Sequence, residues 1–445
     1  MRKIFYGFGG LSYSVISQTI ANFFMFFATS VLGLQGTLVG IAIAISTIWD
    51  GISDTIIGYL SDNRSMGKLG KRNGYMLIAT IGMSIFNIML WIIPSTLSSG
   101  LKFAWIVISL VLLETFNTMF ATPYIALGNE LATSYNDRTK INAFNTIFFL
   151  IGIIIPSVLL VVFLPNTEEY PIGQLNPQGY VKISFVTSAI CLFFGLICSI
   201  STIPKAIHEE KRKKISIKNM FAGFFKSFSN RKLNMLILGY VMTSISTVFL
   251  CSVGLHFFTY SFFYTSKQIT GLLLTLILGN IASQPLWVLI SKKKRKKPAL
   301  ILGILLTIFS VFGIILIYLF RIELYKISYW IMLILIFVCG MGSGAMYTLP
   351  VSLYGDAIDG IVNKSNNKMA TYGGTLTFAG NIANSLTQLI VGVLLDIIKF
   401  DSSIEVQTLG VQTGLALIVF VGIQGALIIG CLIFAGYKEK GEENS

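Results

Sequence analysis

Two aspartates that stand four residues apart, Asp50 and Asp54, are the side chains best suited to chemistry. On a helix this spacing puts both carboxylates on one face, with the Ser53 hydroxyl beside them. Two carboxylates held so close repel each other unless a cation or a proton lies between them, and hard cations prefer carboxylate, hydroxyl and carbonyl oxygens. The cluster therefore predicts a cation site, with sodium at Asp50 and Asp54 as one candidate. The alternative is an ion pair with a basic residue of another helix, but no Lys or Arg lies deep in an apolar segment to supply that partner.

Three further side chains inside apolar segments have two interpretations each. Glu114 and His256 either line a cavity or hydrogen-bond a neighbouring helix, and Trp49 either stacks on a ligand or packs in the interior. An ionisable group at mid-bilayer costs roughly 2.5 to 3.5 kcal/mol on insertion scales, so Glu114 and His256 are candidates for function. By contrast, glycines inside apolar segments are more typical of close helix packing, as at Gly340, Gly342 and Gly344.

The composition of the chain shows what must hold these side chains. Of its 445 residues, 54% are hydrophobic and only 12% are charged, with a mean hydropathy of +0.77. Soluble domains carry about twice that share of charge, so the chain is expected to be a polytopic membrane protein. The five cysteines lie in apolar stretches without metal-ligand spacing and are expected to be reduced thiols. The net charge of +14 does not indicate nucleic-acid binding, because the basic residues lie between apolar blocks.

Twelve apolar stretches are long enough to cross a bilayer as helices, since about 20 residues suffice and backbone polar groups in lipid must be paired. The predicted fold is thus all-α, with twelve transmembrane helices. The expected spans are 10–32, 36–60, 74–95, 102–126, 143–164, 180–204, 233–258, 269–290, 298–320, 328–349, 370–397 and 410–436. A polar, basic linker at 205–232 divides the chain into a six-helix half at 1–204 and another at 233–445.

The distribution of positive charge predicts the orientation. One side of the predicted membrane carries 27 of the Lys and Arg residues and the other carries 6. Because cytoplasmic loops are enriched in Lys and Arg, we expect a multi-pass protein of the cell membrane with both termini in the cytoplasm. The basic clusters can also serve as sites for anionic lipids, although fixing the topology is a sufficient explanation.

The two halves share a short internal repeat. Pro123 to Glu130 resembles Pro350 to Asp356, and Lys140 to Phe144 resembles Lys368 to Tyr372, at offsets of 227 and 228 residues. Duplicated six-helix halves are typical of secondary transporters. No G-x-x-x-x-G-K-[ST] motif is present, so energy is expected to come from a gradient. No Ser/His/Asp arrangement is recognisable either, and an enzyme is not predicted.

The segment from Gly58 to Asp62, followed by Arg64, Gly70, Lys71 and Arg72, resembles the signature loop of the major facilitator superfamily. Other segments resemble the glycoside–pentoside–hexuronide:cation symporter family, in the right order from residue 6 to about 395. They are Tyr6 to Gly9, Trp49 to Asp54, Pro123 to Leu127 with Glu130, Asp137 to Thr139, Asn230 with Arg231, Asp356 with Asp359, and Lys368 to Phe378.

This resemblance implies a set of roles. The family's cation site falls on Asp50, Ser53 and Asp54, with Thr118 as a further ligand. A cytoplasmic gate falls on Asp62, Arg64, Lys71, Arg72, Glu130, Arg138 and Asp356. Substrate-binding positions fall on Ser14, Asn22, Trp49, Ala121, Ile125, Asn145 or Thr146, and Asn381. Most positions at which the sugar transporters carry charged side chains are neutral here, and charged groups normally grip sugar hydroxyls.

Three hypotheses follow. The first is symport of a sugar or related small organic solute, coupled to sodium or protons by alternating access. The second is a relative that carries an amphipathic cargo, lipid-like or peptide. The third is a non-transporting sensor or assembly factor in the same fold. The expected partners are a small-molecule substrate, the coupling cation and the lipid bilayer. Nucleic acid and cofactors other than the cation are not expected, and the protein is expected to be a monomer.

Overall fold

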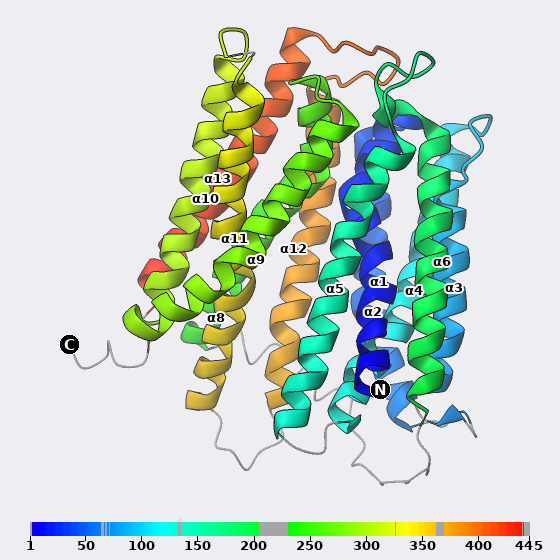
Figure 1. The fold of residues 1–445 in the computed structure, drawn as a ribbon, viewed down its shortest axis with the longest axis vertical. Helices are drawn as coiled ribbons and strands as arrows, with labels where there is room; N and C mark the ends of the chain where they lie inside the picture. The colour runs from blue at the N-terminus through cyan, green and yellow to red at the C-terminus, as the bar shows by residue number, and fades with distance from the viewer. Residues whose placement is uncertain are drawn as a thin grey trace. The chain divides into compact units, whose positions relative to one another are not determined.

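The computed structural model describes residues 2–63, 66, 69–70, 72–131, 135–203, 230–324, 326–361, 369–437 and 439. Within these residues, twelve helices are long and apolar enough to cross a membrane, which confirms the predicted all-α, twelve-span fold. The chain divides into two compact units, one of residues 1–215 with 401–403 and one of residues 216–400 with 404–445. Figure 1 shows the long helices of each unit lying beside one another, from blue to green in the first and from green to red in the second.

The first unit is built around α1. Its helices are α1 (Arg2–Phe26), α2 (Gly36–Asn63), α3 (Asn73–Trp91), α4 (Ser99–Leu131), α5 (Tyr135–Phe163) and α6 (Pro177–Ser201), with a π-helical turn η1 (Phe27–Val31) and a short 3₁₀ helix η3 (Gly173–Leu175). Helix α1 packs against α5 and α6, whereas α4 packs against α2 and α3. Aromatic rings fill one end of the core, where Trp91 lies parallel to Tyr180 with ring centroids 5.7 Å apart.

The second unit contains α8 (Arg231–Tyr260), α9 (Ser266–Lys294), α10 (Lys296–Leu319), α11 (Ser328–Ile361), α12 (Met369–Ile397) and α13 (Leu409–Gly436). Helix α11 packs against α9 and α10, and α8 packs against α12 and α13. The close approach of α11 depends on glycine. A Cβ atom at Gly342 would lie 2.2 Å from Thr307 Oγ1, and one at Gly340 would lie 2.2 Å from the Leu276 carbonyl oxygen. These glycines therefore serve helix packing, as small residues do in membranes.

Several helices extend beyond the spans expected from hydropathy. Helix α1 begins at Arg2 rather than near residue 10, α4 continues to Leu131 and α5 begins at Tyr135. Hydropathy detects only the apolar part of a helix, whereas the polar ends remain helical in the interface and outside it. The longer helices matter here because the end of α4 carries Glu130, and the end of α11 carries Asp356.

Candidate functional site

The two aspartates of the predicted cation site project from α2 toward α4. The Thr118 hydroxyl of α4 donates a hydrogen bond to Asp50 Oδ1 at 2.7 Å. The Ser53 hydroxyl, in turn, lies 3.2 Å from Thr118 Oγ1 and 3.0 Å from the Asp50 carbonyl oxygen. Ser53 and Thr118 are buried, whereas both aspartates are half-buried. The fold thus brings together all four residues predicted for the cation site.

A fifth residue, Thr122, belongs to the same cluster and was not predicted. The Thr122 hydroxyl donates to Asp54 Oδ1 at 3.2 Å. Thr118 and Thr122 are four residues apart on α4, just as Asp50 and Asp54 are on α2, so the two helices present matching pairs of side chains. The sequence signal was the Thr-x-x-x-Thr spacing, which gains meaning only when α4 is known to face α2.

Glu114 lies one turn before Thr118 on α4 and adds a third carboxylate to the neighbourhood. It interacts electrostatically with both Asp50 and Asp54, and its Oε2 atom accepts a hydrogen bond of 3.1 Å from Asn117 Nδ2. In the part of the chain that the structure describes, no three His, Cys, Asp or Glu side chains are grouped closely enough to share one metal ion. Glu114 is therefore an ionisable neighbour of the cluster rather than a third carboxylate ligand.

The chemistry of this cluster is that of a hard-cation or proton site. Its donor atoms are carboxylate and hydroxyl oxygens, which suit a hard monovalent cation rather than a soft transition metal. Because charge is costly inside a membrane, the negative charges of Asp50, Asp54 and Glu114 favour the uptake of a cation or of protons. No ligand is needed to build the cluster, since α2 and α4 already hold it through hydrogen bonds between their side chains.

Trp49 precedes the cluster and is anchored to α4. Its indole Nε1 donates a hydrogen bond of 2.7 Å to Thr115 Oγ1, and 37% of the residue is exposed. The ring therefore has a fixed orientation and an accessible surface, both of which a stacking role requires. Of the other predicted substrate positions on α4, Ala121 is half-buried and Ile125 is 61% exposed.

Two of the predicted substrate positions on α1 and α5, Ser14 and Asn145, lie in contacts between helices. The buried Ser14 hydroxyl donates to the Phe149 carbonyl of α5 at 3.1 Å. Asn145 accepts a bond of 2.8 Å from the Tyr124 hydroxyl, and Thr146 is exposed. On α1, Asn22 Oδ1 accepts from Gln18 Nε2 at 2.8 Å. Asn381 is half-buried on α12, in the second unit.

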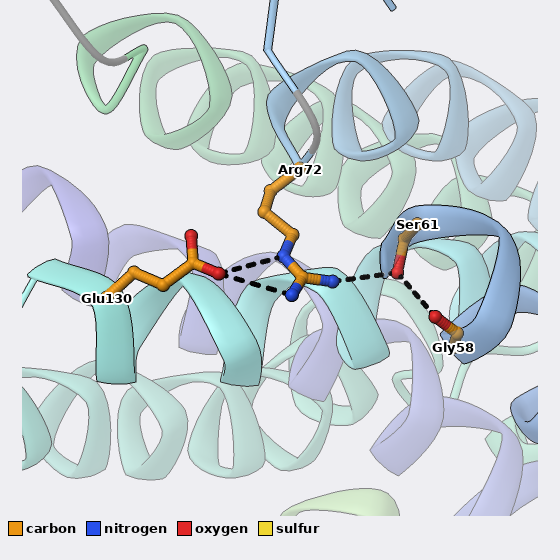
Figure 2. Close-up of polar contacts among 4 residues, drawn as sticks. All are labelled: Gly58, Ser61, Arg72 and Glu130. Carbon is orange, nitrogen blue, oxygen red and sulfur yellow. Dashed lines mark hydrogen bonds and ion pairs between the residues drawn. The ribbon is translucent and has the colours of Figure 1, made fainter. Parts of the chain in front are cut away.

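One ion pair of the predicted gate is formed within the first unit. Arg72 is only 6% exposed, and its Nε and Nη2 atoms donate to Glu130 Oε1 at 3.3 and 3.2 Å. Figure 2 shows the third guanidinium nitrogen, Nη1, donating to the Ser61 hydroxyl at 2.9 Å, which itself donates to the Gly58 carbonyl at 3.2 Å. Arg72 thereby links the start of α3 to the ends of α2 and α4. Ser61 was not predicted to take part.

The second unit carries a corresponding pair. Lys296 at the start of α10 forms an ion pair with Asp356 near the end of α11, just as Arg72 before α3 pairs with Glu130 at the end of α4. This recurrence at matching places agrees with the internal repeat in the sequence. The other predicted gate positions, Arg64 and Lys71 and the side chains of Asp62 and Arg138, lie outside the described residues.

Comparison with known proteins decides the family. Residues 5–438 match the family model described as "MFS/sugar transport protein". The chain belongs to this family. Its members are membrane transporters of the major facilitator superfamily, which agrees with the resemblance inferred from the sequence and with the twelve-span fold.

Relatives of the family include proteins named as symporters. An uncharacterized symporter of Synechocystis sp. is 31% identical over 199 residues, which cover 44% of this chain and 36% of that protein. Sodium-dependent lysophosphatidylcholine symporter 1-B of Danio rerio is 21% identical over 471 residues, 99% of this chain and 88% of that protein. The crystal structure of nucleoside transporter NupG aligns with a TM-score of 0.68 at 14% identity and covers 99% of this chain and 100% of its own, a likeness of fold alone.

Proposed function

We propose that the protein is a secondary active symporter that couples the movement of sodium or protons to that of a small organic solute by alternating access. The observation that carries the proposal is the pairing of Asp50 and Asp54 with the Thr118 and Thr122 hydroxyls. A hydroxyl beside each carboxylate, in a membrane-spanning segment, suits a site that is alternately filled and emptied by a cation. The names of the two symporter relatives support the same activity.

Coupling follows from the electrostatics of the site. When the cation is absent, the charges of Asp50, Asp54 and Glu114 are unbalanced in a medium of low polarity, which is costly. A bound cation removes this cost, so it favours the conformation in which the site is complete. A cation that binds one conformation better shifts the population toward it, and the substrate that prefers the same conformation then binds more tightly.

For the substrate, a sugar or related small organic solute is the first candidate, because the matching family is one of sugar transport. An amphipathic cargo is the second. Two observations favour it: the predicted substrate positions are neutral or apolar, and the zebrafish relative that aligns with nearly the whole chain is named for lysophosphatidylcholine. In either case we expect a monomer in the cell membrane with both termini in the cytoplasm, without nucleic-acid partners, enzymatic activity or any cofactor except the coupling cation.

The proposal is tested with Asp54→Asn in proteoliposomes. We expect the variant to lose cation-driven accumulation but to retain downhill exchange, since the substrate is held elsewhere. A panel of glycosides and lysolipids, offered under sodium gradients and under pH gradients, identifies both the substrate class and the coupling ion. In detergent, sodium should raise the melting temperature of the parent protein and not that of the variant.

The matched control is Asp401→Asn. Asp401 lies in the exposed segment after α12, where hydrogen bonds from the Ser403 hydroxyl and backbone amide lower the pKa of its carboxyl group. Its charge is therefore present but is remote in sequence from the cluster, and uptake should be unchanged. If Asp54→Asn merely lowers the melting temperature and neither sodium nor pH affects the parent, the cation site is refuted. If Asp54→Asn leaves a working function intact, a non-transporting role becomes the better explanation.

A further inference from the structure

The turn between α9 and α10 consists of basic residues. Lys292, Lys293 and Lys294 end α9, Arg295 is the single residue between the helices, and α10 begins with Lys296 and Lys297. The first four side chains are exposed, and the last two are half-buried. Both helices are membrane spans, so the cluster lies where the spans leave the apolar core. We refer to residues 292–295 as the basic turn.

Two described acidic groups near the basic turn, those of Asp356 and Glu439, are engaged by its neighbours. Asp356 pairs with the Lys296 side chain. The two carboxylate oxygens of Glu439 accept hydrogen bonds of 3.4 Å from the backbone nitrogens of Lys296 and Lys297 and so cap the start of α10. Within the described part of the chain, none of the four side chains of the basic turn forms an ion pair. Four exposed positive charges in succession are therefore available to a negatively charged ligand.

The basic turn holds an arginine in a strained backbone conformation. Arg295 has φ 72° and ψ 168°, a conformation that glycine adopts readily and that other residues avoid. A glycine here would form the same tight turn without strain, and the neighbouring lysines would still satisfy the orientation rule for positive loops. The exposed side chain at this position is nevertheless a charged one, so the turn presents a fourth basic group beside the three lysines.

An apolar wall adjoins the basic turn. On the last turns of α9, Leu286 is 39% exposed, Val288 is 50% exposed and Leu289 is 58% exposed. On a helix, Leu289 lies on the same face as Lys292 and Lys293, three and four residues further on. An anionic phospholipid matches both features of this surface. Its head group suits the positive charge at the edge of the bilayer, and its acyl chains suit the exposed apolar side chains.

We propose that the basic turn and the exposed end of α9 form a binding site for an anionic phospholipid. The phosphate and any further negative group of the head group contact Lys292, Lys293, Lys294 and Arg295, while an acyl chain lies along Leu286 and Leu289. The site shares no residue with the predicted cation and substrate positions, so lipid binding and transport can be tested with different variants.

The test measures retention of phosphatidylglycerol against phosphatidylcholine by native mass spectrometry, together with melting temperature in micelles of each lipid. The triple variant Lys292→Gln, Lys293→Gln, Lys294→Gln should bind phosphatidylglycerol about a hundredfold more weakly, since each basic residue near a membrane surface adds to the attraction for anionic lipid. The matched control removes three exposed charges elsewhere on the side predicted to be cytoplasmic, at Lys140, Arg231 and Lys232. It should retain the preference.

A second variant separates lipid binding from folding. Arg295→Gly relieves the backbone strain, so it should raise the melting temperature in phosphatidylcholine while weakening phosphatidylglycerol retention. The proposal is overturned if the triple variant and its control lose phosphatidylglycerol equally, or if the parent shows no preference for the anionic lipid. It is also overturned if soluble glycerol phosphate stabilises the parent as well as the lipid does, because the site would then bind a free anion.

Discussion

The Thr118 hydroxyl offers the sharpest test of the cation cluster, because it connects α4 to two of the other members. It donates a hydrogen bond to Asp50 Oδ1 at 2.7 Å and accepts one from the Ser53 hydroxyl at 3.2 Å. Thr118→Val removes this oxygen with almost no change in shape. The predicted contact of this oxygen with the cation is a polar contact to a charged group, which contributes about 1.5 to 3 kcal/mol, so its loss corresponds to roughly ten- to hundredfold weaker cation binding.

The assay is the dependence of the melting temperature on sodium concentration in detergent. A bound ligand stabilises the folded state by RT ln(1 + [L]/Kd), about 2.7 kcal/mol when its concentration is 100 times the Kd. With a tenfold weaker Kd at the same concentration, about 1.4 kcal/mol remains. We therefore expect Thr118→Val to lose about half of the sodium-dependent stabilisation and to need at least ten times more sodium for the half-maximal effect.

Two comparisons protect this result from a trivial explanation. Thr387→Val removes a buried hydroxyl that donates to the Ala383 carbonyl one turn back within α12, so it controls for the loss of an ordinary helix hydrogen bond. It should leave the sodium titration unchanged. Thr118→Val also lowers stability without sodium, because Asp50 loses a donor, but that change is measured separately. An unaltered half-maximal sodium concentration in Thr118→Val would refute the placement of the cation beside Asp50.

Three further predictions follow from individual contacts. Glu114→Gln should weaken sodium binding by a few fold, less than Asp54→Asn does, because it removes a charge that both aspartates sense; an unchanged titration would contradict this. Arg72→Lys should destabilise the protein by about 1 to 2 kcal/mol in thermal unfolding, because the forked contact with Glu130 and the bond to Ser61 cannot both be kept; equal melting temperatures would argue against it. Gly342→Ala should cost about 1 to 3 kcal/mol through overpacking against Thr307. Gly355→Ala on the same helix, where an added Cβ would meet no atom within 4 Å, should instead stabilise the protein by about 0.5 to 1 kcal/mol in the same measurement.

The number of helices and their type were predictable from the sequence. A chain in lipid must pair its backbone groups within each segment, so the length and composition of apolar stretches suffice to count spans. The spacing of Asp50 and Asp54 likewise identified a cluster, because residues four apart share a helix face whatever the helix packs against. The resemblance to known symporters added Thr118. The helix count, the aspartate cluster and the addition of Thr118 all depend on local composition, periodicity or motifs, which a single sequence displays directly.

The ends of the helices were less accessible to sequence reasoning. The predicted spans 102–126 and 328–349 stopped where hydropathy fell, but α4 continues to Leu131 and α11 continues past Pro350 to Ile361. Polar residues at these ends remain helical outside the apolar core, and hydropathy carries no information about them. As a result, the sequence could name Glu130 and Asp356 as gate residues but could not pair them with Arg72 and Lys296.

The sequence by itself determined twelve apolar helices, an intramembrane pair of carboxylates and the family to which they point. Only the tertiary structure decided which helix faces which: that Thr122 joins Asp54, that Glu114 lends its charge to the cluster, and that Arg72 binds Ser61 as well as Glu130. The reason is physical. Within a membrane every helix presents a largely apolar surface to lipid and to protein alike, so hydrophobicity does not specify partners. Pairing depends instead on the fit of small residues and on a few polar contacts between helices that are distant in the sequence.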